Sequence, residues 1–407
     1  MEFLDKNNKL ATFCRLSVFL LPVAYVGSVL AVEPQPIEAG AFNIIPTVTV
    51  DLQDTDNMFL SNANEVDSRL TIISPRLEAV TESNGNSLSL FGQVDEANFS
   101  ATDEDDYTDW RIGGDAHLQM NVRNSLDFNA GIFRTREMRG TGFSQGGFLP
   151  TSPDRYEETT YGASYQFGTN DSFGRLVLSA NSYDKSYRNN RITTQFRDRE
   201  DMDFSGAFYL NISPRTDVFV EYIQSDIDYG TDPLVIAGSP DSLDSDEDYY
   251  YVGVSWEASG ATTGSLKVGR GEKEFDDIDR GEGDLTSWEA NILWEPLSYS
   301  AVNFTASQSF DEATGVGNAL EARRYSINWQ HGWSDNLTST VNWYTSDDEY
   351  TGSTRQDDID ALSFRLDYSV QRWFDVYVSF SQDERSSNFG NFNYEQNVAA
   401  IGFQASL

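Results

Sequence analysis

Turn-forming clusters recur about every forty residues through most of this sequence. They combine Asn, Gly, Ser, Pro and Asp, and are centred near positions 84, 124, 170, 214, 260, 296, 335 and 372. Between two clusters the chain has room for two strands of roughly ten residues and a longer loop. Nine such segments give eighteen strands, an even number that returns both termini to one side. The spacing predicts an all-β fold, a single transmembrane antiparallel up-and-down barrel of about eighteen strands, with sixteen as the alternative.

Within the segments, apolar and polar residues alternate. Residues 109–122 place Trp110 and Ile112 on one parity and Asp115 and His117 on the other. A period of two gives a strand one apolar and one polar face. In a soluble sandwich the apolar face would pack against a second sheet, whereas in a membrane barrel it would face lipid. The regular alternation of short turns with long acidic loops favours the membrane barrel.

Tyrosine and tryptophan residues gather near both ends of the predicted strands. Rings of amphipathic aromatic residues at two levels are typical of the two interfaces of a membrane. At the short-turn end, the predicted girdle consists of Trp294, Tyr299, Trp329, Trp333 and Trp373. At the long-loop end, we expect a second ring from Tyr107, Trp110, Tyr229, Tyr249, Tyr250 and Tyr344.

The first thirty-one residues have the layout of a secretory signal peptide. Basic residues precede an apolar stretch over 16–30, and a small residue, Ala31, suits cleavage. The only cysteine, Cys14, falls within this segment, so no disulfide or thiol chemistry is expected after cleavage. We predict a signal peptide over 1–31, a short periplasmic lead-in over 32–40, and an outer-membrane barrel over 41–407.

The last strand is expected to close the barrel. Ile401, Phe403, Ala405 and Leu407 alternate up to the end of the sequence, which resembles the C-terminal signal that outer-membrane barrels present to the barrel assembly machinery. The strongest form of that signal ends in an aromatic residue, and this sequence ends in leucine. By pairing with the first strand, near residues 42–52, the last strand would remove both open edges of the sheet.

The charge of the chain excludes one class of partner. The net charge is −37, so the phosphates of a nucleic acid would be repelled. The acidic clusters map to the long loops, where carboxylates could bind divalent cations or bridge to lipopolysaccharide phosphates, but none has the spacing of a calcium-binding loop. We predict no cofactor and no metal site.

The polar faces supply the candidate functional residues. A water-filled channel lined by carboxylates repels anions and concentrates cations, so we expect a lumen that prefers cations or neutral solutes. The longest glycine-rich loop, 139–156, is the expected constriction. The predicted pore-lining residues are Arg111, Asp115, His117, Glu221, Lys267, Glu289, Arg365, Asp367 and Asp375.

Catalysis is not expected of this chain. It contains two histidines, His117 on a polar parity and His331 on an apolar parity between Trp329 and Trp333. A Ser–His–Asn arrangement on the outer wall would suit a barrel phospholipase, but Ser326 and other nearby polar residues fall on the opposite face from His331. We interpret His331 as part of an aromatic girdle.

The start of the mature sequence resembles a known family. An early strand, an acidic loop (Asp54-Thr55-Asp56-Asn57) and a second strand with Ile73-Ser74-Pro75 are similar to the putative β-barrel porins of the second type, which overlap with outer-membrane proteins found with exopolysaccharide biosynthesis clusters. The resemblance extends loosely over most of the mature chain. It implies an outer-membrane channel of a Gram-negative bacterium for secreted polysaccharide, and no catalytic site.

Three functions remain open from the sequence. The first is a channel for export or passage of saccharide polymers, the second a general porin for small solutes, and the third a receptor or adhesin acting through the acidic loops. The expected surroundings are outer-membrane lipid and lipopolysaccharide, with both termini periplasmic and a homotrimer as one possible assembly.

Overall fold

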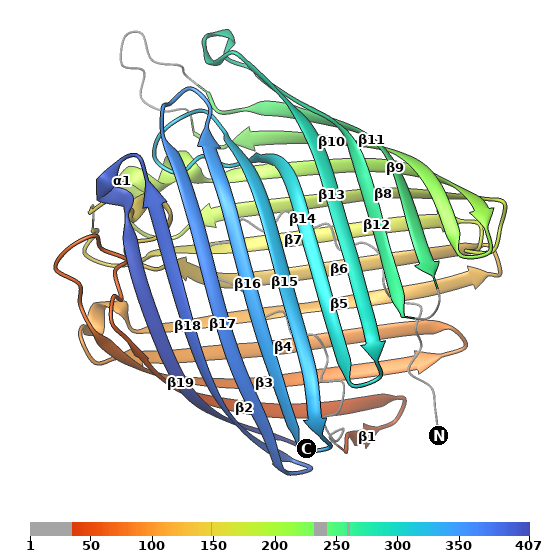
Figure 1. Cartoon of the computed structure of the whole chain (residues 1–407), viewed down its shortest axis with the longest axis horizontal. Helices are drawn as coiled ribbons and strands as arrows, with labels where there is room; N and C mark the ends of the chain where they lie inside the picture. Colours follow the sequence, from red (N-terminus) through yellow and green to blue (C-terminus); the bar gives the residue numbers. More distant parts are fainter. Residues whose placement is uncertain (1–34, 148, 232–241, 259–260) are drawn as a thin grey trace.

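The strands of this protein close into a barrel. The computed structural model describes residues 35–147, 149–231, 242–258 and 261–407. In that part of the chain, nineteen strands form one antiparallel sheet in which each strand neighbours the next in sequence. The last strand pairs with the second, with Ile401 opposite Leu52, so β2 to β19 form a closed ring of eighteen (Figure 1). The predicted eighteen strands are therefore confirmed, and the alternative of sixteen is wrong.

All strands except the three-residue β1 are long enough to cross a membrane. They are β1 (Ile37–Ala39), β2 (Phe42–Thr55), β3 (Ser68–Ser83), β4 (Asn86–Phe99), β5 (Tyr107–Asn121), β6 (Asn124–Glu137), β7 (Asp154–Phe167), β8 (Gly174–Tyr187), β9 (Arg199–Ser213), β10 (Thr216–Tyr229), β11 (Ser245–Ala258), β12 (Thr262–Phe275), β13 (Glu282–Leu297), β14 (Ser300–Asp311), β15 (Leu320–Ser334), β16 (Leu337–Tyr350), β17 (Gln356–Gln371), β18 (Phe374–Ser387) and β19 (Tyr394–Ser406). The helices are α1 (Arg191–Thr194) and the 3-10 turns η1 (Asp103–Asp105), η2 (Gly142–Ser144), η3 (Gln195–Arg197), η4 (Ile278–Arg280) and η5 (Gly390–Phe392). Among the described residues, no helix is long and apolar enough to cross a membrane.

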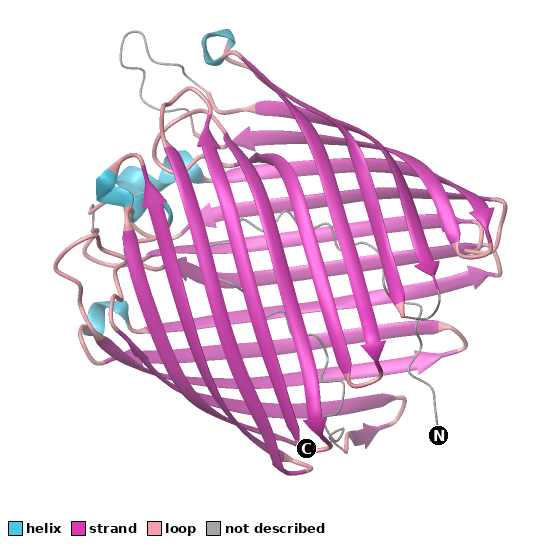
Figure 2. Ribbon diagram, in the orientation of Figure 1, coloured by secondary structure: helices cyan, strands magenta, loops and turns pink. Residues whose placement is uncertain are grey.

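The two ends of the barrel differ in their connections. One end carries tight turns and the other carries the long loops, which contain all of these short helices (Figure 2). The β3–β4 turn shows why the predicted clusters make turns: Asn84 and Gly85 have φ of +52° and +79°, as a two-residue hairpin of type I′ requires. Residues 259–260 of one predicted turn, residues 232–241 of one long loop and the predicted signal peptide lie outside the described residues.

The predicted lead-in contains a short strand. Ile37 lies opposite Ile44, and Ala39 lies opposite Phe42, so β1 pairs with the start of β2. This pairing occurs at the short-turn end, where β19 also ends (Figure 1). The chain therefore begins and ends its barrel at the same end, as the even strand number requires.

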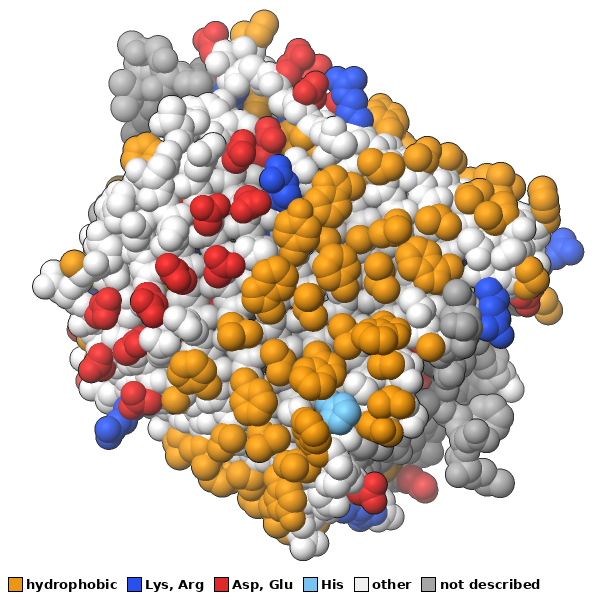
Figure 3. Space-filling view, viewed as in Figure 1, with side chains coloured by type: hydrophobic (Ala, Val, Ile, Leu, Met, Phe, Trp, Pro, Cys, Tyr) orange, Lys and Arg blue, Asp and Glu red, His pale blue; other side chains and the backbone are white. Residues whose placement is uncertain are grey.

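The outer wall is apolar. Side chains of one parity, such as Ile112, Val252 and Leu362, are more than half exposed although they are large and hydrophobic. Figure 3 shows such side chains gathered in a broad band across the visible wall, with Asp and Glu on the long-loop side of it. A soluble protein would bury a surface of this extent, whereas lipid covers it in an outer-membrane barrel.

Three clusters of buried apolar side chains inside the barrel lie at the long-loop end. One group contains Tyr249, Tyr251, Leu285 and Phe310, near the loop ends of β11, β13 and β14. Two others contain Met58, Leu70, Ala97 and Phe99, and Leu320, Ala322 and Tyr350. These residues pack beneath the long loops. Packed apolar side chains therefore line the wall at this end.

A contact between side chains spans the seam where the ring closes. Tyr377 of β18 lies on the inner face opposite Gly402 of β19, and Gly402 lies opposite Asp51 of β2. The Tyr377 hydroxyl donates a hydrogen bond to the Asp51 carboxylate. A Cβ at Gly402 would overlap the Tyr377 ring, so the missing side chain lets tyrosine reach across the whole strand.

Candidate functional site

The inner wall brings three of the predicted pore-lining residues together. Lys267 of β12 lies between Glu221 of β10 and Glu289 of β13, with its Nζ 2.9 Å and 3.3 Å from their carboxylate oxygens. The Lys267 side chain is almost fully buried, and its ammonium group also lies over the Tyr251 ring. Strand order explains this contact, because β10, β11, β12 and β13 are consecutive in the sheet.

The other predicted pore-lining residues lie elsewhere on the inner wall. Arg365 and Asp367 of β17 form an ion pair at 2.7 Å. On β5, Arg111 pairs with Asp95 at 2.8 Å, and His117 contacts Asp127 at 2.7 Å. The nine residues thus line separate sectors. Asp115 and Asp375 are at least partly exposed and belong to no ion pair within the described residues.

Three of the five predicted girdle residues, Tyr299, Trp329 and Trp333, cluster around His331 at the short-turn end. His331 packs against the rings of Tyr299, Trp329 and Trp333, with centroid distances of 4.5 to 5.7 Å. The indole N–H of Trp329 donates to Ser300, and that of Trp333 donates to Ser339. The exposed Trp294 belongs to the neighbouring strand β13, and Trp373 packs against Phe374 in the β17–β18 turn region. Histidine here has aromatic neighbours, as expected of a girdle position.

The aromatic ring predicted at the long-loop end is largely wrong. Trp110 and Tyr250 lie on the outward parity of their strands, with Tyr250 half exposed. Tyr107, Tyr229, Tyr249 and Tyr344 instead point to the inner face, where Tyr249 is buried in an apolar cluster and Tyr229 donates to Glu312. The physical reason is that the long loops turn into the barrel and offer these rings partners inside it.

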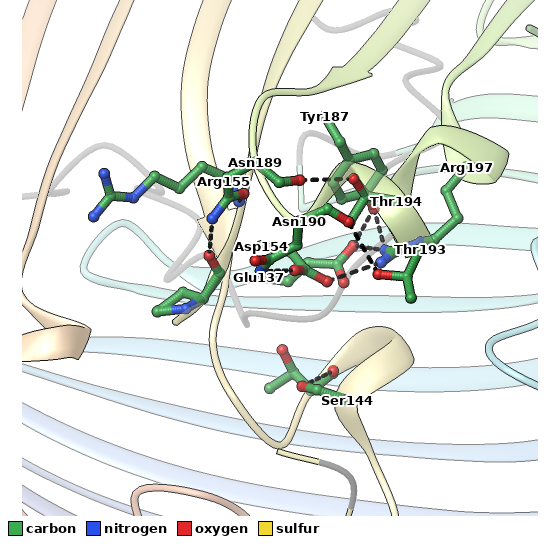
Figure 4. A network of polar contacts seen from close by, with 12 residues as sticks. Glu137, Ser144, Asp154, Arg155, Tyr187, Asn189, Asn190, Thr193, Thr194 and Arg197 are labelled. Carbon is green, nitrogen blue, oxygen red and sulfur yellow. Dashed lines mark hydrogen bonds and ion pairs between the residues drawn. The ribbon is translucent and has the colours of Figure 1, made fainter. Parts of the chain in front are cut away.

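No sequence pattern predicted the network of hydrogen bonds around Arg197, which lies in the β8–β9 loop. Its guanidinium donates to Glu137 and, at 3.2 Å, to Asp154, and it stacks on Phe143 with its carbon 3.6 Å from the ring centre. Figure 4 shows Arg197 pointing at Glu137 and Tyr187. Burial alone would lower the pKa of Arg197, but Glu137 more than offsets this and raises it. The arginine therefore stays charged and fixes the β6–β7 loop to the β8–β9 loop.

A second arginine joins several long loops. The Arg355 side chain, fully buried before the start of β17, pairs with the equally buried Asp357. It also donates to the Thr314 carbonyl in the β14–β15 loop and to the Gln145 side chain in the β6–β7 loop. Its guanidinium lies over the rings of Tyr350 and Phe392, the latter in the β18–β19 loop. Arg355 thus holds four loops in one arrangement.

The β6–β7 connection, residues 138–153, lies across the mouth of the barrel. Gln145 accepts hydrogen bonds from Arg355 at 3.0 Å and from Arg385 of β18 at 2.6 Å. By the shorter way round the ring, five strands separate β6 from β18. This connection is most of the loop predicted to constrict the channel. Its contacts place it over the lumen, whereas no sequence pattern could have paired Gln145 with residues more than two hundred positions away.

The described residues contain no group of three or more His, Cys, Asp or Glu placed to hold a metal ion. Their inner wall combines ion pairs, uncompensated carboxylates and uncharged hydrogen-bonding groups. This arrangement can attract and orient solutes.

Several solved structures are similar to this chain over most of its length. Among solved structures, OpdO from Pseudomonas aeruginosa shares 12% identity and a TM-score of 0.47, over 92% of this chain and 98% of that one. OccAB2 from Acinetobacter baumannii has 12% sequence identity and a TM-score of 0.47, over 91% of this chain and 99% of that one. The siderophore receptor PirA from Acinetobacter baumannii has 8% sequence identity and a TM-score of 0.44, over 89% of this chain and 80% of that one.

No curated protein matches the chain. The sequence profile of the family described as "Putative beta-barrel porin 2" matches residues 31–407. This match confirms the resemblance seen at the start of the mature sequence. The protein is an outer-membrane-type barrel, and the chain belongs to this second family of β-barrel porins.

Proposed function

We propose that this protein is an outer-membrane channel for the export or passage of saccharide polymers, with a lumen that prefers cations and neutral solutes. Family membership and the closed barrel support a channel. The resemblance to proteins of exopolysaccharide clusters supports a saccharide. In this proposal the short-turn end and both termini face the periplasm, and the long loops face outward.

The observation that carries the charge preference is an imbalance on the inner wall. Basic side chains such as Arg111, Lys267 and Arg365 are each held in an ion pair. Several carboxylates on the same face, by contrast, have no ion-pair partner among the described residues: Asp115, Asp203, Asp375 and Asp383. Paired charges largely cancel at a distance, so these carboxylates set the sign of the potential that a passing solute meets.

Removing three of these carboxylates should reduce the preference for cations. The variant Asp115→Asn/Asp375→Asn/Asp383→Asn keeps side-chain size and removes three negative charges. A unit charge about 4 Å from an ion in water changes its energy by about 1 kcal/mol, so each carboxylate near the ion path can change the permeability ratio by up to about fivefold. Reversal potentials in planar bilayers under a potassium chloride gradient would measure this change.

A matched control carries its substitutions on the outer wall. Asp347 and Asp360 lie on the outward parity of β16 and β17, where Asp347 pairs with Arg323. Asp347→Asn/Asp360→Asn should leave the reversal potential unchanged. Anion selectivity of the unmodified protein, or an equal shift in the control, would contradict the proposed lumen.

A general porin for small solutes is the second candidate. The β6–β7 connection favours it, because contacts of Gln145 with Arg355 and Arg385 hold a loop across the mouth, where it would restrict the size of a passing solute. Liposome swelling in sugars of increasing length distinguishes the two functions. A sharp cut-off at small sugars supports the porin, and entry of long chains supports polymer passage.

A further inference from the structure

One sector of the inner wall carries no charge. Five residues lie side by side on consecutive strands β14 to β18: Asn303, Asn328, Asn342, Ser363 and Ser381. We call these five residues the neutral row. Their chain neighbours Ile327, Trp343 and Leu362 are exposed apolar residues of the outer wall, so the row faces the lumen. All five side chains are partly exposed there.

A second uncharged line borders the neutral row on its long-loop side. Asn291, Thr305, Ser326 and Tyr344 occupy opposing positions on β13 to β16, and the hydroxyls of Thr305 and Ser326 are 2.6 Å apart. Charged side chains border both lines. On β13, Glu289 accepts a hydrogen bond from the Asn291 amide at 2.6 Å, and on β15 Arg324 lies two residues from Ser326. On β17 and β18, Arg365 and Asp383 lie two residues beyond Ser363 and Ser381 of the neutral row.

The groups in the neutral row keep hydrogen-bonding capacity. The Asn328 amide donates to the Asn342 carbonyl oxygen, and the Asn342 amide donates to the Ser363 hydroxyl at 3.0 Å. Each amide has two N–H donors and an oxygen with two lone pairs, so these bonds leave donors and acceptors free. Asn303, at one end, makes no side-chain hydrogen bond to any described residue.

This chemistry fits one class of solute. Carboxylates only accept hydrogen bonds and guanidinium groups only donate them, whereas amides and hydroxyls do both. A neutral sugar carries many hydroxyls that also do both, so it can exchange bonds with water for bonds with the row at little cost. A simple ion would form no comparable set of hydrogen bonds with these uncharged groups.

The geometry suits an extended chain. Neighbouring strands lie about 4.8 Å apart, so five strands place equivalent groups over about 19 Å. Strands of outer-membrane barrels tilt by about 35–45°, so a line drawn across them advances along the channel axis as it runs around the wall. Successive sugar units could therefore pass from one amide or hydroxyl to the next while advancing through the lumen.

We infer that the neutral row is a binding track for neutral saccharides inside the channel. This inference rests on the proposed channel function and narrows its solute to polyhydroxylated chains without charge. The track lies on β14 to β18, away from the Glu221–Lys267–Glu289 group on β10 to β13.

Blocking of single-channel current by maltohexaose tests the track. The refolded full-length protein in a planar bilayer should show current interruptions whose frequency rises with sugar concentration. Polyethylene glycol of matched size, which accepts hydrogen bonds but donates almost none, should block more weakly. In Asn328→Leu/Asn342→Leu, the sugar should bind about tenfold less tightly, because two hydrogen bonds of ordinary net strength are lost.

Two further variants keep the test decisive. Asn129 and Asn181 face the lumen on β6 and β8, on either side of Gly162. Asn129→Leu/Asn181→Leu makes the same chemical change on another wall and should leave sugar binding unaltered. Ser363→Ala is a milder change within the track that should fold in any case, and it should weaken the block about threefold.

The outcomes separate the track from the channel proposal. Equal block by sugar and polyethylene glycol, equal weakening in the Asn129 and Asn181 control, or no sugar block at all would overturn the track. In that case, cation-selective conductance in the same bilayers would still support the proposed channel function. Anion-selective conductance with sugar block that depends on Asn328 and Asn342 would keep the track and overturn the proposed lumen charge.

Discussion

Replacing Arg355 with alanine should open the long-loop end and destabilise it by about 3–5 kcal/mol, the usual cost of removing one partner of a buried ion pair. Asp357 is fully buried and would keep only Arg385, whose Nε lies 3.8 Å from its carboxylate, as an ion-pair partner, so the loss should lie at the lower end of this range. Gln145 and the Thr314 carbonyl would also lose a donor each. Since Arg355 holds four loops together, we expect a higher and noisier single-channel conductance.

Two comparisons give this prediction its control. Arg323→Ala removes an exposed arginine that pairs with Asp347 across 3.5 Å, and exposed pairs contribute only about 0–1 kcal/mol. Arg355→Lys keeps the charge but loses the planar fork that contacts Asp357 and Gln145 together. Urea unfolding and conductance should therefore rank Arg323→Ala closest to wild type and Arg355→Ala furthest. An Arg355→Ala protein with unchanged conductance would show that these loops do not limit the pore.

Replacing Gly402 with valine should weaken the closing seam by about 3 kcal/mol. The new side chain would overlap the Tyr377 ring, and an overpacked site typically costs about 1–3 kcal/mol. Tyr377 would move away from Asp51, and a hydrogen bond to a charged group contributes about 1.5–3 kcal/mol. Arg365, whose guanidinium lies over the Tyr377 ring, would lose that contact too. Unfolding in urea, followed by tryptophan fluorescence, would measure the loss.

A glycine elsewhere in the wall separates this effect from the general cost of valine. Gly92 of β4 has nothing within 4 Å of a Cβ built on it. Gly92→Val should stay within about 1 kcal/mol of the wild type, and it can even gain slightly from β-propensity. If Gly92→Val and Gly402→Val lose equal stability, the crossing of β19 by Tyr377 does not strengthen the seam.

The wall of this protein could be predicted from its sequence because its signals are local. Asn84 and Gly85 adopt the positive φ angles of their turn without help from the rest of the fold. Alternation along a strand likewise decides which side chains face lipid, as at Ile112 and Leu362. Turn spacing and parity together were enough for strand number, strand order and the two faces.

The long-loop end could not be predicted in the same way. Tyr249 belongs to a residue type that is common in aromatic girdles, but Phe310 and Leu285 give it an apolar site inside the barrel. Gln145 and Arg385 are 240 positions apart and meet only because a loop crosses the mouth. Such contacts depend on the closed ring, and no local pattern encodes them. The ion pairs of Lys267 likewise depend on the register of four strands, which no local pattern encodes.

The apolar clusters inside the barrel are all at one end, which gives the molecule two regions of different stiffness. Around the ring, every strand is held by two hydrogen-bonded neighbours, so no strand can leave without breaking two ladders. The inner filling is held instead by side chains and can loosen while the ring stays intact. The packed side chains at the long-loop end can therefore rearrange without breaking the hydrogen-bonded ring.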